Sequence, residues 1–202
     1  FFRDDLLLTK KVAEVKFGAN IPENRMLASE ELGFGPWAIN IGVTNSADTL
    51  ISPFGDNRAD ALAYPNQSKS FMVQNLATRI DSNFNYNFSI YLIGLGALPN
   101  SAAQMKLVAG SEQVSVGLLL SSEWVRMDLP FSAPSSWGSL FDVGVECNSY
   151  AEVFGGWGAL VNSGTALGEY IRTQGVISSG GPELLTYFSG ELQGVRFARG
   201  SV

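Results

Sequence analysis

The sequence of 202 residues contains no histidine and a single cysteine, Cys147. Without histidine the chain cannot form a Ser-His-Asp triad, a histidine general base, or a zinc or iron site with histidine ligands. One cysteine excludes an intrachain disulfide, a thiolate zinc cluster and a redox-active cysteine pair. Because Cys147 ends an alternating apolar run, we expect it to be a buried, small hydrophobic residue.

Charge is also scarce. Charged residues make up 16% of the chain, and acidic residues outnumber basic ones to give a net charge of −6. An acidic chain without a basic run is not expected to bind nucleic acid. The longest apolar run, about eight residues around 91–98, is far shorter than a bilayer span, so we expect no membrane insertion.

What the sequence does contain is a series of short alternating segments separated by turn residues. No stretch of ten or more residues has the amphipathic pattern of a helix. In segment 86–92, Tyr86, Phe88 and Ile90 fall on one face. About eight such segments at regular spacing predict an all-β fold, an antiparallel jelly-roll β-sandwich. The predicted strands are 37–43, 70–74, 86–92, 105–108, 113–116, 125–129, 141–147 and 153–161, with turns at Asn45-Ser46, at 53–57 and at Pro130.

Three parts of the chain are expected. Residues 1–23 have no clean periodicity and are interpreted as an N-terminal arm, with one short strand around 12–17. Residues 24–173 contain all the predicted strands of the sandwich. Residues 174–202 begin with a linker rich in glycine and serine and are predicted to form a C-terminal hairpin extension.

Five blocks within residues 24–173 follow the order of motifs in one known family. The family motifs are N-L-L-x-x-S-E-x-F with a later W, D-G-T-x-T-A-D-K-L, G-x-x-Y-T-F-S-V-Y, T-x-x-W-Q-R, and L-W-G-A-Q-L-E with a later Y-I-P-T. The matching blocks in this chain are 24–32 with Trp37, 55–62, 84–91, 122–126, and 156–160 with 170–173.

These blocks resemble a jelly-roll family that is widespread in bacteriophage tail, collar and fibre proteins and is similar to carbohydrate-binding modules. The resemblance implies a virion structural protein of a phage particle, in a tail fibre, collar or baseplate. Such a protein would act in assembly or host attachment, with weak binding of a cell-surface glycan as a further activity. The alternatives are the carbohydrate-binding module of a secreted glycan-degrading enzyme and a capsid decoration protein.

The two extensions carry apolar residues outside the predicted sandwich, including Leu6-Leu7-Leu8, Val195 and Phe197. Exposed apolar patches usually mark an interface, and a two-stranded hairpin needs a surface on which to pack. We therefore expect a homo-oligomer and contacts with other virion proteins. The family resemblance favours a trimer. The competing possibility is that both extensions fold back on their own sandwich.

No enzymatic activity is expected. A glycosidase needs two carboxylates roughly 5–10 Å apart, whereas Asp142 and Glu146, four residues apart on one predicted strand, would be separated by roughly 13 Å. No cofactor is expected either. The acidic turn that contains Asp56 and Asp60 offers oxygen ligands for a structural calcium ion, and an ordinary turn is the alternative.

Glycan binding is the main hypothesis for a site. Sugar-binding sandwiches lay aromatic rings against pyranose faces and surround them with polar side chains. Trp37, Trp124 and Trp157 match framework positions and are expected to pack in the core. Trp137 lies in a polar loop, either as an exposed binding residue or as a loop anchor. The remaining candidates would line one open sheet face, which could instead be a subunit interface or a plain solvated surface: Tyr91, Asn87, Asp142, Glu146 and Lys106.

Overall fold

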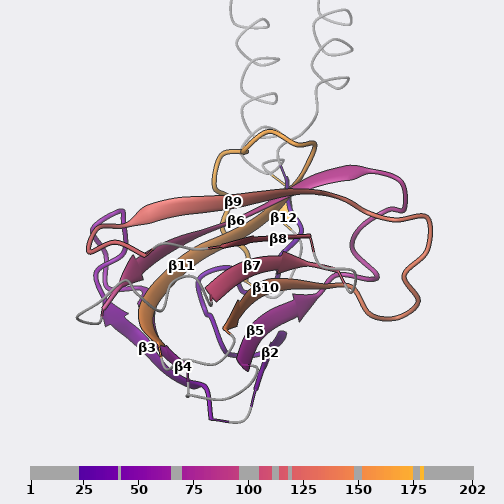
Figure 1. Cartoon of the computed structure of the whole chain (residues 1–202). Coiled ribbons are helices and arrows are strands. Elements are labelled where there is room, and N and C mark those ends of the chain that lie inside the picture. Colours follow the sequence, from indigo (N-terminus) through magenta and orange to yellow (C-terminus); the bar gives the residue numbers. More distant parts are fainter. Residues whose placement is uncertain are drawn as a thin grey trace, which may run out of the picture.

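The computed structural model describes residues 23–40, 42–64, 70–95, 105–110, 114–117, 120–147, 152–174 and 178–179. These residues form two five-stranded antiparallel sheets that lie one over the other, and they contain no helix (Figure 1). The prediction of an all-β, antiparallel jelly-roll sandwich is confirmed. The short strand expected around 12–17 and the C-terminal hairpin lie outside the described residues.

Each sheet combines strands that are far apart in the sequence. The first has the order β2 (Trp37–Ile39), β5 (Ser70–Asn75), β10 (Asp142–Cys147), β7 (Met105–Ala109) and β8 (Val114–Gly117). The second has the order β3 (Thr44–Leu50), β4 (Ala59–Tyr64), β11 (Glu152–Ser163), β6 (Asn85–Gly94) and β9 (Val125–Ser132). A separate pair, β1 (Glu23–Asn24) and β12 (Ser178–Ser179), brings the two ends of the described chain together.

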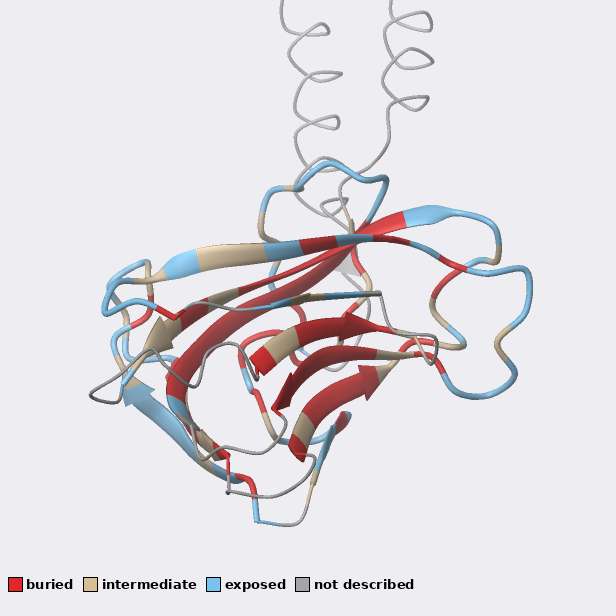
Figure 2. Cartoon of the chain, in the orientation of Figure 1, coloured by how far each residue is buried: buried red, intermediate tan, exposed pale blue. Residues whose placement is uncertain are grey.

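The core lies between the sheets and follows the predicted alternation. Tyr86, Phe88 and Ile90 of β6 are fully buried in it. Cys147 is buried in the same core, as expected. Figure 2 shows the buried residues concentrated in the central strands, whereas β3 at the edge of the second sheet is largely exposed.

The structure corrects the predicted strand at 37–43. This segment is not one strand, because Val43 donates a backbone hydrogen bond to Asn40 and Gly42 has a φ of 93°. The chain turns there and crosses from the first sheet to the second. The predicted turn at Asn45-Ser46 is therefore wrong, since both residues lie within β3.

Two further differences concern the second sheet. Strand β4 was not predicted, although it follows directly after the predicted turn at 53–57. Pro130 does not end its strand, because β9 continues to Ser132. Proline is tolerated here since β9 is an edge strand, in which part of the backbone needs no partner.

Two irregular segments complete the second sheet beside β11. The pairing of β4 with β11 ends at Gly156, and residues 25–29 lie beside the rest of β11. The Arg25 amide donates to the Val161 carbonyl and the Ala159 amide donates to the Ser29 carbonyl, both at 2.9 Å. Segment 164–173 crosses the outer side of this sheet, where Asn87 donates to the Thr165 carbonyl at 2.9 Å. No helix in the described part of the chain has the length and hydropathy needed to cross a membrane.

Candidate functional site

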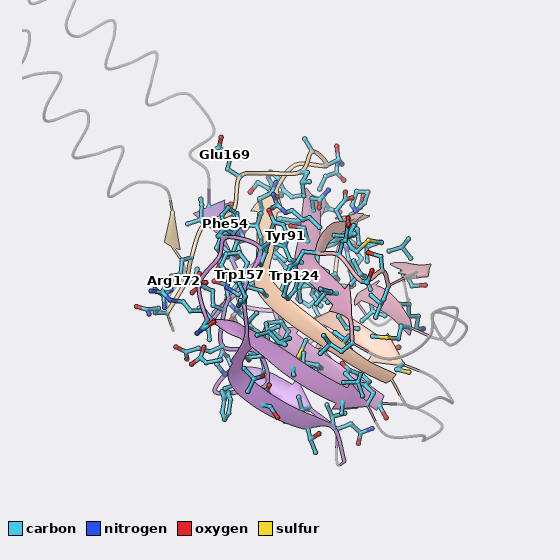
Figure 3. All side chains as sticks on the ribbon, turned by 90° about the vertical axis from the view of Figure 1, so that its left-hand side faces the viewer. Phe54, Tyr91, Trp124, Trp157, Glu169 and Arg172 are labelled. Carbon is cyan, nitrogen blue, oxygen red and sulfur yellow. The ribbon has the colours of Figure 1, made fainter. Side chains whose placement is uncertain are left out.

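Four aromatic rings gather on the outer side of the second sheet. Trp157 of β11 lies directly opposite Tyr91 of β6 in the strand register, and their ring centroids are 5.7 Å apart. Phe54, from the loop before β4, packs on Trp157 at 5.2 Å and on Tyr91 at 5.9 Å. Tyr170 also packs on Trp157, at 4.5 Å. We call these four residues the aromatic face, and Figure 3 shows Phe54, Tyr91 and Trp157 together on the side that faces the viewer.

Trp157 lies on the outer side of the sheet by regular alternation from the buried Phe154, and a β-bulge follows it. The register between β11 and β6 shifts between Trp157 and Leu160. Gly158 within the bulge has a φ of 66°, and a Cβ there would lie 3.2 Å from the Tyr170 ring and 3.4 Å from the Tyr91 ring. Glycine at this position thus allows both the left-handed backbone and the close approach of the two tyrosines.

The loop that carries Phe54 is held by its own hydrogen bonds. The Ser52 amide donates to the Asp56 carbonyl at 2.7 Å, and the Ser52 hydroxyl donates to the Asp56 carboxylate at 2.5 Å. The Trp124 indole donates to the Ile51 carbonyl at 3.0 Å, which ties the loop to the residue that precedes β9. In this position the Phe54 side chain is held at the aromatic face while 66% of the residue stays exposed.

Polar side chains adjoin the aromatic face along β6 and β9. The Arg126 guanidinium lies over the Tyr91 ring, 5.5 Å from its centroid, and donates to the Ser89 hydroxyl from Nε at 3.3 Å and Nη2 at 3.0 Å. Asn87 donates to the Asp128 carboxylate at 3.0 Å. Within the described residues, the buried Trp157 Nε1 has no hydrogen-bond partner.

Tyr170 contacts a cluster of charged side chains that contains Glu30, Arg58 and Arg172. Glu30 is buried, and its carboxylate accepts a hydrogen bond from the Tyr170 hydroxyl at 3.1 Å and lies 2.9 Å from Nε of Arg172. Arg58 is 3.7 Å from the same carboxylate. Burial raises the pKa of Tyr170, so its hydroxyl stays protonated. Figure 3 places Arg172, together with the exposed Glu169, at the margin of the aromatic face.

The structure separates the residues that were predicted to line one open face. Tyr91 and Asn87 lie on β6 of the second sheet, whereas Asp142 and Glu146 lie on β10 of the first. The prediction of a shared face is therefore wrong. Alternation within a strand indicates which residues share a side, but it does not indicate which sheet the strand joins. The Glu146 carboxylate lies 3.3 Å from Lys106, and Asp142 accepts a hydrogen bond from Asn75 at 3.1 Å.

The tryptophans also differ in their environments. Trp37 is buried in the core, as expected. Trp137 is half-buried against the core, stacks edge-on with Phe141 at 5.5 Å and donates to the Ala77 carbonyl at 3.3 Å, which favours the loop anchor. Trp124 and Trp157 are absent from the core cluster and adjoin the Phe54 loop instead. Sequence reasoning missed Phe54, although a large aromatic residue inside a turn cluster was a usable signal.

The two calcium candidates hold different partners. Asp56 binds Ser52 and lies 3.3 Å from Arg58. Asp60 is buried and accepts hydrogen bonds from the Asp48 amide at 3.0 Å and from Asn45 at 3.2 Å. In the described ranges no three acidic or cysteine side chains are grouped as metal ligands would be. A calcium ion at this turn stays a prediction.

Asp60 leads to a prediction of pH dependence. Burial raises its pKa from 3.8 to about 6. Between these two pH values the folded state retains a proton that the unfolded state has released, so this residue makes the free energy of unfolding fall as pH rises. We expect the free energy of unfolding of Asp60→Asn, taken relative to that of the wild type, to increase as the pH rises from 4 to 7. Urea unfolding at each pH measures this difference. A difference that stays constant over this range would contradict the prediction.

Comparisons with known proteins identify the fold. No protein-family model matches the sequence, and no curated protein gives a significant match. The CBM22-1 xylan-binding domain of Paenibacillus barcinonensis Xyn10C is similar with a TM-score of 0.56 and 12% identity, over 74% of this chain and 100% of that domain. The CBM22-2 domain of the same protein has a TM-score of 0.54 and 9% identity, over 69% of this chain and 99% of that domain.

A phage protein is also among the similar structures. The enzymatically active domain of tailspike protein 4 from bacteriophage CBA120 has a TM-score of 0.51 and 8% identity, over 69% of this chain but only 21% of that one. At such low identities these similarities establish a carbohydrate-binding-module-like sandwich. They do not establish membership of a phage family.

Proposed function

We propose that this chain is a non-catalytic glycan-binding domain and that its aromatic face is the binding site. The observation that carries the proposal is the position of Phe54, which is exposed to 66% yet held beside Tyr91 and Trp157. A ring in this position can cover the C–H face of a sugar and remove it from water. The half-exposed Arg126 beside Tyr91 supplies hydrogen-bond donors for the hydroxyl groups.

Binding without catalysis is consistent with the carboxylates near the aromatic face. Glu30 lies within 4 Å of both Arg172 and Arg58, and Asp56 is bound to Ser52 and paired with Arg58. A catalytic acid or nucleophile has to be presented to the substrate in a pocket, whereas these two carboxylates are engaged by arginine and serine side chains of the same chain. The fold similarity to xylan-binding domains supports the same proposal.

Replacing Phe54 tests the proposal. We expect Phe54→Ala to weaken binding to a soluble polysaccharide at least about tenfold, because an aromatic side chain contributes about 1.5–3 kcal/mol when it is buried. Affinity electrophoresis on a panel of plant and bacterial polysaccharides measures this change. Melting temperatures should be nearly equal, since Phe54 is mostly exposed.

The chain offers a matched control. Phe84 is also exposed, to 62%, but it precedes β6, whereas Tyr91 lies near the other end of that strand. We expect Phe84→Ala to leave binding unchanged. Equal effects of the two substitutions, or no binding to any polysaccharide in the panel, would argue against a glycan site at the aromatic face.

A role in a phage virion is the second candidate. It is supported by the order of the five sequence blocks and by the fold similarity to a tailspike domain. The fold similarities favour the module of a secreted glycan-degrading enzyme more strongly. Neighbouring capsid and tail genes would support the virion role, and a catalytic domain in the same reading frame would support the enzyme module. The trimer stays a prediction.

A further inference from the structure

Among the described lysine and arginine residues, Arg126 differs in its partners. Arg25, Arg58, Arg172 and Lys106 each lie within 4 Å of a carboxylate. The remaining two form no ion pair with any described residue. One of them, Arg79, donates to the Arg25 carbonyl and to the Gln74 side chain. Among the described residues, Arg126 instead has one hydrogen-bond partner, the neutral Ser89 hydroxyl.

The hydrogen bonds of Arg126 leave donors in excess. Both Nε and Nη2 donate to a single oxygen of Ser89, although a guanidinium has five N–H groups. No described residue accepts a hydrogen bond from its Nη1. Asp128, two residues further along β9 and on the same side, accepts a hydrogen bond from Asn87. Arg126 is half-exposed and its guanidinium lies over the Tyr91 ring, beside the aromatic face, where a ligand can reach it.

A second donor lies on the other side of Tyr91. Trp157, opposite Tyr91 in the register, is 3% exposed, and its buried Nε1 has no acceptor in the described part of the structure. A buried donor without a partner is costly, because it has lost its hydrogen bond to water. Tyr91 is therefore flanked by Arg126 on β9, which has more donors than described acceptors, and by the Trp157 indole on β11, which has no described acceptor.

We propose that the glycan bound at the aromatic face is acidic, with hexuronate carboxylates, and that Arg126 selects it. This inference rests on the glycan-binding function proposed above. A carboxylate is purely an acceptor and fits the planar fork of a guanidinium with two parallel hydrogen bonds. A sugar hydroxyl both donates and accepts, so it matches an excess of donors less well. With a net charge of −6 the chain does not attract polyanions as a whole, and recognition must come from a local cation.

The experiment compares acidic polysaccharides with their neutral counterparts. The probes are polygalacturonate and glucuronate-substituted xylan, each in its native and carboxyl-reduced form. We expect the wild-type chain to bind a native form at least about tenfold more tightly than its reduced form, as a charge-assisted hydrogen bond predicts. Arg126→Gln should abolish this preference, because it weakens binding of the native form more than binding of the reduced form. Arg126→Lys should restore only part of it, because lysine cannot bind in the bidentate mode.

The control is Lys106→Gln, which removes the same charge from the opposite sheet and should keep the preference. The wild type could bind the native and the reduced polysaccharide equally well, and Phe54→Ala could lose this binding. That result would overturn acidic specificity but not glycan binding. Failure to bind any polysaccharide would overturn both. Dextran sulfate bound as tightly as the uronates would indicate general anion binding and overturn selection of a carboxylate.

Discussion

Replacing Asn24 with alanine is expected to destabilise the fold by about 3–5 kcal/mol, because it leaves several buried backbone groups without partners. Asn24 is fully buried, and its amide nitrogen donates to the Ala159 carbonyl at 2.9 Å and to the Ile171 carbonyl at 2.6 Å. Its oxygen accepts from the Met26 amide at 3.0 Å and from the Val161 amide at 3.1 Å. The Asn24 side chain thus joins residues 24–26 to β11 and to the segment 164–173 that follows it.

Urea unfolding of Asn24→Ala measures the loss directly. Asn85→Ala is the matched control, since Asn85 is exposed and hydrogen-bonds only to the Ser132 hydroxyl among the described side chains. We expect the control to lie within about 0.5 kcal/mol of the wild type. Asn24→Asp keeps the acceptor but loses both donors and should be destabilised as well. An Asn24→Ala variant as stable as the control would show that these hydrogen bonds do not hold the segments together.

Trp157→Ala is expected to cost about 3–5 kcal/mol of stability, the usual range for a large buried aromatic residue. Trp157 is 3% exposed and is in ring contact with Phe54, Tyr91 and Tyr170 at once. Its removal would leave a cavity between β11 and the Phe54 loop. We therefore assign Trp157 a structural role, in which it supports the rings that are more exposed than itself.

Thermal unfolding and polysaccharide binding should be measured on the same Trp157 variants. Trp157→Phe keeps a ring at this position and removes the indole N–H, which has no partner in the described residues. We expect it to retain most of the stability that Trp157→Ala loses. A Trp157→Ala variant that keeps its melting temperature but no longer binds polysaccharide would show that Trp157 acts mainly on the ligand.

The local pattern of the sequence was enough to predict most strands and their buried sides. Seven of the predicted strands coincide with observed ones to within a few residues, from β5 to β11. The alternation in 86–92 correctly separated core residues such as Phe88 from outer residues such as Tyr91. This succeeds because successive side chains of a strand point to opposite sides, whatever the strand pairs with.

The candidate site was less predictable, because its residues come from different parts of the chain. Phe54, Tyr91, Trp157 and Tyr170 belong to a loop, two strands and a crossing segment. Trp157 was expected in the core, yet it lies on the outer side, and the bulge after it returns Ala159 and Val161 to the core. A bulge depends on how two strands pair, and a single strand's pattern does not contain that information.

The sequence alone determined the composition of the chain, the exclusion of histidine and disulfide chemistry, the all-β class and the alternation within each strand. The tertiary structure decided which strands share a sheet, and so it separated Tyr91 from Glu146 and placed Tyr91 beside Arg126. The physical reason is the range of the interactions. Side-chain alternation is set by neighbours in the chain, whereas sheet order is set by hydrogen bonds and burial between segments far apart in sequence.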